Sequence, residues 1–162
     1  MPKFDTTITG NCGENYVASY LAGFGMIAAL TRAGLTGLDM MVTEAASGKP
    51  MKIQVKTTRD GRGKQKGRWF YSWNTSYSVV KNQDDNLWFA YVDLNEWPEK
   101  EKLPHLFFVP SSFVAGRIQQ DYKPESSPTY FSLFDDEAEE YRSIKGLGKM
   151  RAEMAANPTN KD

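Results

Sequence analysis

The sequence predicts an α/β fold, with a central mixed β-sheet flanked by helices. The chain has 162 residues, of which 40% are hydrophobic and 25% are charged. This composition is typical of one globular domain, and it excludes a disordered or collagen-like chain. Segments with helical periodicity are also interspersed with short apolar segments typical of strands, which favours a layered α/β architecture.

The N-terminal region is expected to form a long buried helix. Asn11 followed by Glu14 resembles a capping box, and apolar residues recur at helical spacing up to Gly34, which is expected to end the helix. The apolar run Tyr16–Leu30 is too short to span a bilayer, so we expect no membrane segment there. The single cysteine, Cys12, forms no intramolecular disulfide, which fits a cytoplasmic protein.

Three β-strands and a short helix are expected next. Leu38–Glu44 and Met51–Thr58 are short and rich in strand-forming residues, and Ser47–Pro50 between them has the composition of a turn. These segments predict a β-hairpin. Arg68–Asn74 is dense in aromatic residues and is expected to be a third antiparallel strand, followed by a short helix at Ser76–Asn82.

The second half of the chain is expected to hold two buried strands and two helices. They are Leu87–Leu94, Leu106–Val109, a helix capped by Ser111 or Ser112 and reaching Gln120, and a helix over Asp135–Lys145. We expect residues 1–148 to form one domain and residues 149–162 to form a polar tail.

The zero net charge hides an uneven distribution along the chain. Residues 1–83 carry 11 Lys and Arg against 5 Asp and Glu, whereas residues 84–162 carry 9 against 15. We therefore expect a basic side that attracts a polyanion and an acidic side that repels it. The most basic segment contains three glycines and is expected to be a mobile loop that contacts phosphates, with a merely solvated hairpin loop as the alternative. Its basic residues are Arg59, Arg62, Lys64, Lys66 and Arg68.

Strand alternation predicts a cluster of polar side chains on the hairpin. Lys52, Gln54 and Lys56 share one face of their strand, and pairing with the preceding strand brings Asp39 close to Gln54 and Lys56. A carboxylate and an amide oxygen are suitable ligands for Mg²⁺. A lysine beside them can orient or deprotonate a water and offset charge on a phosphorane. This chemistry is that of phosphodiester hydrolysis.

These residues resemble the motif of the PD-(D/E)xK nuclease superfamily. The similarity lies in a helical glutamate, Glu14, then GLD ending at Asp39, then QVK from Gln54 to Lys56. It implies a restriction-endonuclease-like fold in which Asp39 and Glu14 bind the metal and Lys56 is the catalytic lysine. Gln54 replaces the usual acidic residue, as it does in a group of homing endonucleases, and the resemblance makes it the third metal ligand.

The resemblance therefore implies a DNA endonuclease that depends on Mg²⁺, with Mn²⁺ as a substitute. Because cutting both strands of a duplex requires two sites, we also expect a homodimer or larger assembly. Three alternatives stay open from the sequence. Glu14 could serve only as a helix cap, the substrate could be RNA, and the chain could be a non-catalytic nucleic-acid-binding or assembly module that retains the nuclease fold.

Overall fold

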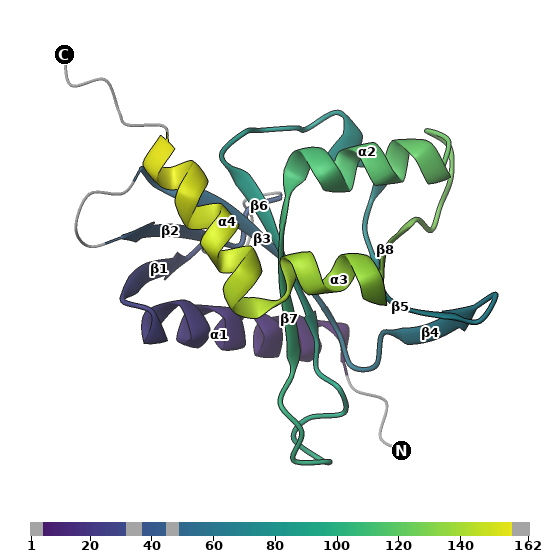
Figure 1. Cartoon of the computed structure of the whole chain (residues 1–162), viewed down its shortest axis with the longest axis horizontal. Coiled ribbons are helices and arrows are strands. Elements are labelled where there is room, and N and C mark those ends of the chain that lie inside the picture. The colour runs from purple at the N-terminus through teal and green to yellow at the C-terminus, as the bar shows by residue number, and fades with distance from the viewer. Residues whose placement is uncertain (1–4, 32–36, 45–48, 157–162) are drawn as a thin grey trace.

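The computed structural model describes residues 5–31, 37–44 and 49–156, arranged as helices and strands around two β-sheets (Figure 1). The elements in chain order are α1 (Thr6–Gly23), β1 (Met26–Leu30), β2 (Met40–Glu44), β3 (Met51–Thr58), β4 (Arg62–Gln65), β5 (Arg68–Asn74), η1 (Tyr77–Val80), β6 (Leu87–Asp93), β7 (His105–Pro110), α2 (Ser111–Asp121), β8 (Tyr130–Phe134), α3 (Asp135–Tyr141) and α4 (Ser143–Ala156). No helix within the described ranges is both long and apolar enough to cross a membrane.

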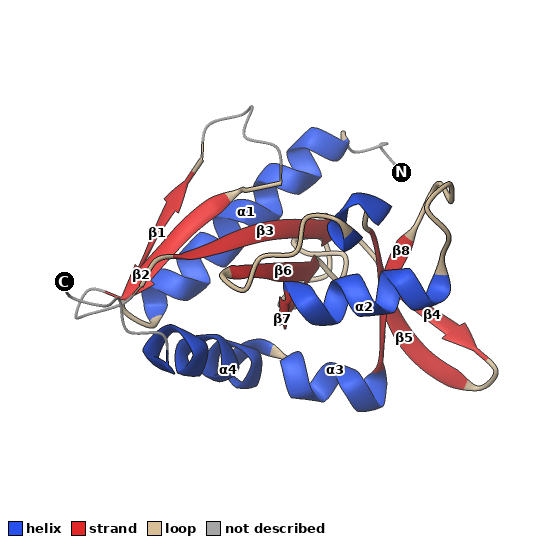
Figure 2. Ribbon diagram, turned by 90° about the horizontal axis from the view of Figure 1, so that it is seen from above, coloured by secondary structure: helices blue, strands red, loops and turns tan. Residues whose placement is uncertain are grey.

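The central sheet has five strands in the order β1-β2-β3-β6-β7 (Figure 2). Strands β3 and β6 run parallel, with Ile53 opposite Trp88, and the other neighbouring pairs are antiparallel. The sheet is therefore mixed, and helices flank it. This confirms the fold class predicted from the sequence, including the hairpin formed by β2 and β3. Residues 47 and 48 of the expected turn lie outside the described residues.

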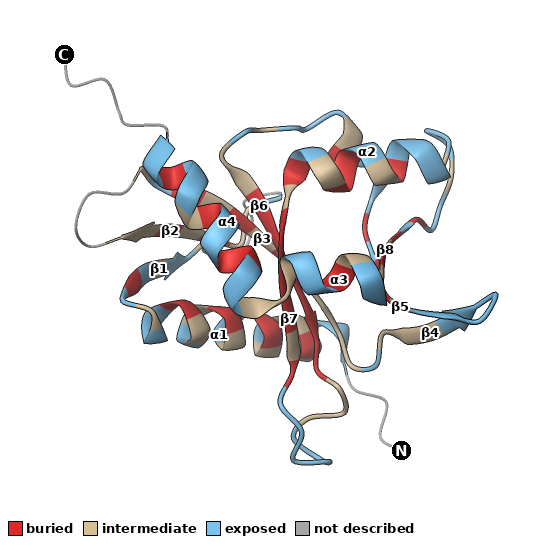
Figure 3. Ribbon diagram, viewed as in Figure 1, coloured by how far each residue is buried: buried red, intermediate tan, exposed pale blue. Residues whose placement is uncertain are grey.

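Helices α1 and α4 cover one face of this sheet and form the first core with it (Figure 3). Val17 and Leu21 of α1 and Met150 of α4 are fully buried against Ile53 of β3 and Ala90 of β6. Burial of such side chains is the main favourable term in folding, at roughly 1.5–3 kcal/mol for each large one. This core fixes the side of β3 that carries Ile53 and Val55.

A second, aromatic core forms on the opposite face, where the β4-β5-β8 sheet and helix α2 pack. The Tyr91 ring stacks on Phe131, with centroids 4.7 Å apart, and tilts against Trp73 at 4.9 Å. The Trp73 indole donates a hydrogen bond to the Val92 carbonyl at 2.8 Å. The second sheet is thereby fastened to the first.

The N-terminal helix is shorter than expected. Asp5 caps it by accepting a hydrogen bond from the Thr7 amide at 2.6 Å, and Gly25 follows its end with φ of +76°. A left-handed residue of this kind ends a helix, and glycine adopts it without steric penalty. Met26–Leu30 then forms strand β1 rather than the rest of the helix, because it pairs with β2. Gly34 lies outside the described residues.

The expected capping box is also wrong, because Glu14 lies in the middle of α1 and not near its first turn. Capping alone therefore does not explain Glu14. Ser111 likewise lies inside α2, whose N-cap is Pro110 without a side-chain hydrogen bond.

The basic segment is a β-hairpin rather than a mobile loop. Strands β4 and β5 pair with each other, and Lys66 and Gly67 form the tight turn with φ of 47° and 82°. Positive φ at both central turn residues matches the twist of a two-residue hairpin. Strand β5 also pairs with β8, an element the sequence did not predict, so the expected third strand belongs to the second sheet.

The C-terminal region differs from the expected single helix and polar tail. The helical segment divides into α3 and α4 at Arg142, which has an extended backbone. Helix α4 continues to Ala156 because Met150 and Met154 bury their side chains in the first core.

Two glycines of α1 provide a test of how this helix packs. A Cβ atom at Gly13 would lie 1.8 Å from Thr57 Oγ1 on β3, whereas a Cβ at Gly10 would meet nothing within 4 Å. We expect Gly13→Ala to lower the free energy of unfolding by about 1–3 kcal/mol through overpacking. Gly10→Ala should instead raise it by up to about 1 kcal/mol through helix propensity. Urea denaturation of both variants measures this, and equal effects would contradict the packing.

Candidate active site

Asp39 is held where strand β2 separates from β3. Its amide donates to the Ile53 carbonyl at 3.0 Å, and its side-chain Oδ2 accepts from the Val55 amide at 2.6 Å. If β2 continued, a backbone carbonyl of β2 would accept the hydrogen bond from the Val55 amide. The Asp39 carboxylate accepts it instead. Its Oδ1 accepts no hydrogen bond from the described residues, so Asp39 is fixed in place with one oxygen left for a ligand.

Glu14 approaches Asp39 from helix α1. The close contact of Gly13 with Thr57 seats α1 against β3, and the next residue, Glu14, is partly buried. Burial raises the pKa of the Glu14 carboxyl, and the negative charge of Asp39 raises it further. The Glu14 side chain makes no hydrogen bond or ion pair with any described residue. The two carboxylates therefore lie close enough for the charge of one to act on the other.

Gln54 and Lys56 lie on the face of β3 that does not pack in the first core. The β2–β3 register pairs Met40 with Ile53, so Asp39 stands opposite Gln54. Gln54 and Lys56 both line a cavity of 740 Å³. Neither side chain forms a hydrogen bond or ion pair within the part of the chain that the structure describes.

This arrangement suits a divalent cation of the Mg²⁺ type. Glu14, Asp39 and Gln54 provide oxygen donors, which hard cations prefer, and a cation would offset the burial of Glu14 and its repulsion by Asp39, the two causes of its raised pKa. Within residues 5–31, 37–44 and 49–156, no three His, Cys, Asp or Glu residues cluster in a way that could hold a metal. The Gln54 amide is therefore needed to complete a three-ligand protein set.

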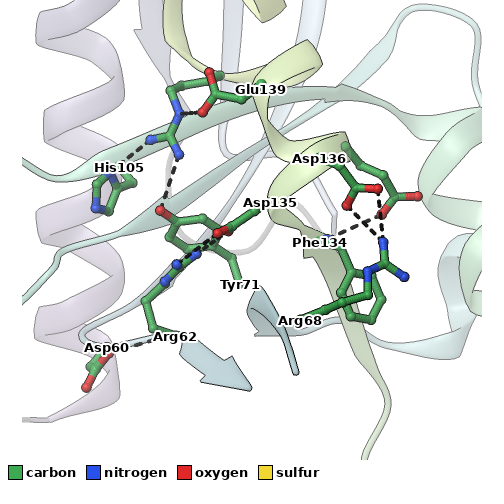
Figure 4. A network of polar contacts seen from close by, with 11 residues as sticks. Asp60, Arg62, Arg68, Tyr71, His105, Phe134, Asp135, Asp136 and Glu139 are labelled. Atoms are coloured by element: carbon green, nitrogen blue, oxygen red, sulfur yellow. Dashed lines mark hydrogen bonds and ion pairs between the residues drawn. The ribbon is translucent and has the colours of Figure 1, made fainter. Parts of the chain in front are cut away.

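The basic hairpin lies against acidic residues from the second half of the chain. Arg68 pairs with Asp136 at 2.8 Å, and Arg62 pairs with Asp135 (Figure 4). Arg59, at the base of the hairpin, pairs with Glu99 at 2.8 Å. The expected separation into a basic and an acidic side is therefore wrong, because folding brings the two charge classes together. Lys64 and Lys66 are exposed on the hairpin. The phosphate-contact role of the five basic residues stays a prediction.

A network of rings and guanidinium groups supports the hairpin (Figure 4). The Arg62 guanidinium lies 4.3 Å from the centroid of the Tyr71 ring, and the Tyr71 hydroxyl accepts from Arg142 at 3.2 Å. Arg142 also contacts His105 Nδ1 at 3.0 Å. Burial and the positive charge of Arg142 lower the pKa of His105, so the imidazole stays neutral at physiological pH. This network holds Arg62 in place relative to the central sheet.

The sequence did not indicate the residues that complete the cavity wall beyond Gln54 and Lys56. Ser76, Ser78 and Asn82 come from the η1 region, and Asp84 precedes β6. The one sequence pattern that pointed to this side of the cavity is the alternation of β3, which places Lys52 on the same face as Gln54 and Lys56. The other side chains are brought there by the parallel pairing of β3 with β6.

The sequence matches no protein-family model and no curated protein sequence. Among solved structures, the chain is similar to a bacterial homing endonuclease, I-Ssp6803I, with a TM-score of 0.60 over 95% of this chain and 96% of that chain at 13% sequence identity. The chain therefore shares its overall fold with that homing endonuclease.

The pairing of Glu14 with Asp39 predicts a coupled titration. Asp39→Asn keeps an oxygen that can accept from the Val55 amide but removes the negative charge, so the pKa of Glu14 should fall toward its usual value. Because an acid with a raised pKa destabilises the folded state once it ionises, the variant should also lose less stability as pH rises through that pKa. Carbon-detected NMR titration of the glutamate carboxyls measures the shift. Asp136→Asn on exposed α3 is the control, and an unchanged Glu14 pKa in Asp39→Asn would contradict the proximity.

Proposed function

We propose that the protein is a metal-dependent endonuclease that hydrolyses phosphodiester bonds in DNA. The observation that carries the proposal is the position of Asp39, which stands opposite Gln54 of β3 and raises the pKa of Glu14 on α1. Lys56, which has no ion pair among the described residues, lies on the same face of β3 as Gln54. The resemblance of these residues to the PD-(D/E)xK pattern and the shared fold with a homing endonuclease support the same reaction.

Oxygen atoms of Glu14, Asp39 and Gln54 would hold Mg²⁺ or Mn²⁺. When bound, the cation would polarise the phosphate and lower the pKa of a water molecule. The Val55 amide fixes the Asp39 carboxylate, so this ligand needs no reorganisation before the cation binds. The proton on Glu14 competes with the cation, so affinity for the cation should rise with pH through the raised pKa of Glu14.

Lys56 would act directly on the reacting groups. Its ammonium has no other partner among the described residues, and it borders the cavity where a phosphodiester would lie. There it would donate hydrogen bonds to the phosphate and orient the attacking water. The water oxygen bonds to phosphorus, one P–O ester bond breaks, and the departing oxygen takes a proton.

The β4–β5 hairpin would contact the duplex. A two-stranded ribbon fits the major groove, and this one exposes Lys64, Lys66 and 47% of the Trp69 surface. The ion pairs of Arg62 with Asp135 and of Arg68 with Asp136 are partly or largely exposed, so phosphate groups can compete for both arginines. Two copies of the chain would supply the two sites that double-strand cleavage requires.

Cleavage assays on supercoiled plasmid with Mg²⁺ or Mn²⁺ test the proposal. We expect Asp39→Asn and Lys56→Ala to lower the cleavage rate by at least about 100-fold, because each removes a group that acts on the transition state. Circular dichroism should show both variants folded, and Lys149→Ala on α4 should cleave as the unchanged protein does. DNA binding without cleavage by the unchanged protein would instead favour a non-catalytic module with the nuclease fold. Full activity of both variants would contradict the assigned residues.

Gln54 offers a separate test of the metal site. Gln54→Glu adds a negative charge to the same ligand position, so we expect Mn²⁺ to bind about tenfold more tightly, since ligand charge sets much of the affinity. Electron paramagnetic resonance of free Mn²⁺ measures this without a cleavage assay. Gln65→Glu, on strand β4, is the matched control and should leave the affinity unchanged. An equal gain in both variants would show that Gln54 is no ligand.

A further inference from the structure

The cavity beside Gln54 and Lys56 has a wall that the proposed hydrolysis does not use. Its polar residues are Lys52, Ser76, Ser78, Asn82, Asp84 and Ser111, and its apolar side includes Phe89. Hydroxyl, amide and ammonium groups are the side-chain donors that proteins direct to DNA phosphates and sugars. Phe89 is only 1% exposed, so no ring face is presented to a base. The wall therefore suits a sugar–phosphate strand.

Lys52 is the cation of this wall, and it pairs with Asp84. Asp84 is fixed by more hydrogen bonds than Lys52 is. The Lys52 Nζ lies 2.7 Å from Asp84 Oδ2. Asp84 Oδ1 accepts from the Asn86 amide at 2.8 Å, and the Asp84 carbonyl accepts from the Ser111 hydroxyl at 2.8 Å. The hydrogen bond from Lys52 is the largest cause of the lowered pKa of Asp84. Asp84 is thus fixed as an anion, whereas the Lys52 side chain is 44% exposed.

We propose that Lys52 binds a phosphate farther along the DNA strand that carries the scissile phosphodiester, and that Asp84 holds Lys52 in place when no DNA is bound. The inference rests on the proposed nuclease function and deepens it. Lys52 and Lys56 share one face of β3 and lie about 13 Å apart along the strand. One lysine therefore reaches the reacting phosphate while the other reaches a phosphate farther along the same strand. Exposed ion pairs contribute little to stability, so a phosphate displaces Asp84 readily.

The test measures DNA binding by fluorescence anisotropy across a salt series, without any divalent cation. Lys52→Gln should weaken binding and reduce the slope of log affinity against log salt by about 0.9, the loss of one phosphate contact. Asp84→Asn should tighten binding by about two- to fivefold, because it releases Lys52 from an exposed ion pair. Lys149→Gln is the matched control: Lys149 is 45% exposed, pairs with Glu140 at 3.0 Å and lies on α4. It should leave the slope unchanged.

The opposite signs of the two variants separate binding from folding. A purely structural ion pair predicts a lower melting temperature for both variants and no opposite change in DNA affinity, and that result would overturn the inference. A slope change of equal size in Lys149→Gln would overturn it as well. A protein that binds DNA with these effects but never cleaves it would contradict the nuclease proposal alone, whereas a protein that binds no DNA would contradict both.

Discussion

Strand β3 has to satisfy two different environments at once, and the rest of the molecule is arranged around that requirement. Its alternate residues Ile53 and Val55 pack under α1 in the first core, so Gln54 and Lys56 are turned to the opposite side. Parallel pairing with β6 along nearly its whole length keeps β3 inside the sheet, whereas β2 pairs only with residues 51–53 and leaves the edge beside Gln54 and Lys56 to Asp39. A register slip of one residue would bury the lysines and expose the core, so the hydrophobic core itself maintains the geometry of the polar face.

Electrostatic interactions connect distant parts of the chain rather than dividing it into two charged sides. Arg62 and Arg68 from the first half pair with Asp135 and Asp136 at the start of α3, and Lys52 pairs with Asp84. These partly or largely exposed pairs contribute little to stability individually. Their effect is to hold the side chains of Arg62, Arg68 and Lys52 in positions where the phosphates of a nucleic acid can bind them. Lys56 differs, since it has no ion pair within the described residues and stands at the candidate site.

The sequence predicted the strands near the site better than the ends of the helices. Short strand-forming segments on either side of a polar turn identify β2 and β3, and nearly continuous apolar runs identify β6 and β7. The sequence pattern predicted the helix ends wrongly in two places. The N-terminal helix ends before Gly25 instead of reaching Gly34, and the polar residues after Gly148 continue a helix instead of forming a tail. In both places a tertiary interaction overrides the local pattern, namely the pairing of β1 with β2 and the burial of Met150 and Met154.

By itself, the sequence determined the α/β class and grouped Asp39, Gln54 and Lys56, because strand alternation and a hairpin are local properties that a few residues encode. Glu14 joined this set only through the family resemblance. Only the tertiary structure decided that α1 brings Glu14 to Asp39, since that approach depends on the contact of Gly13 with Thr57, far along the chain. It also decided which cations are paired. Charge pairing depends on distance in space, and residues 62 and 135 become neighbours only when the second sheet folds.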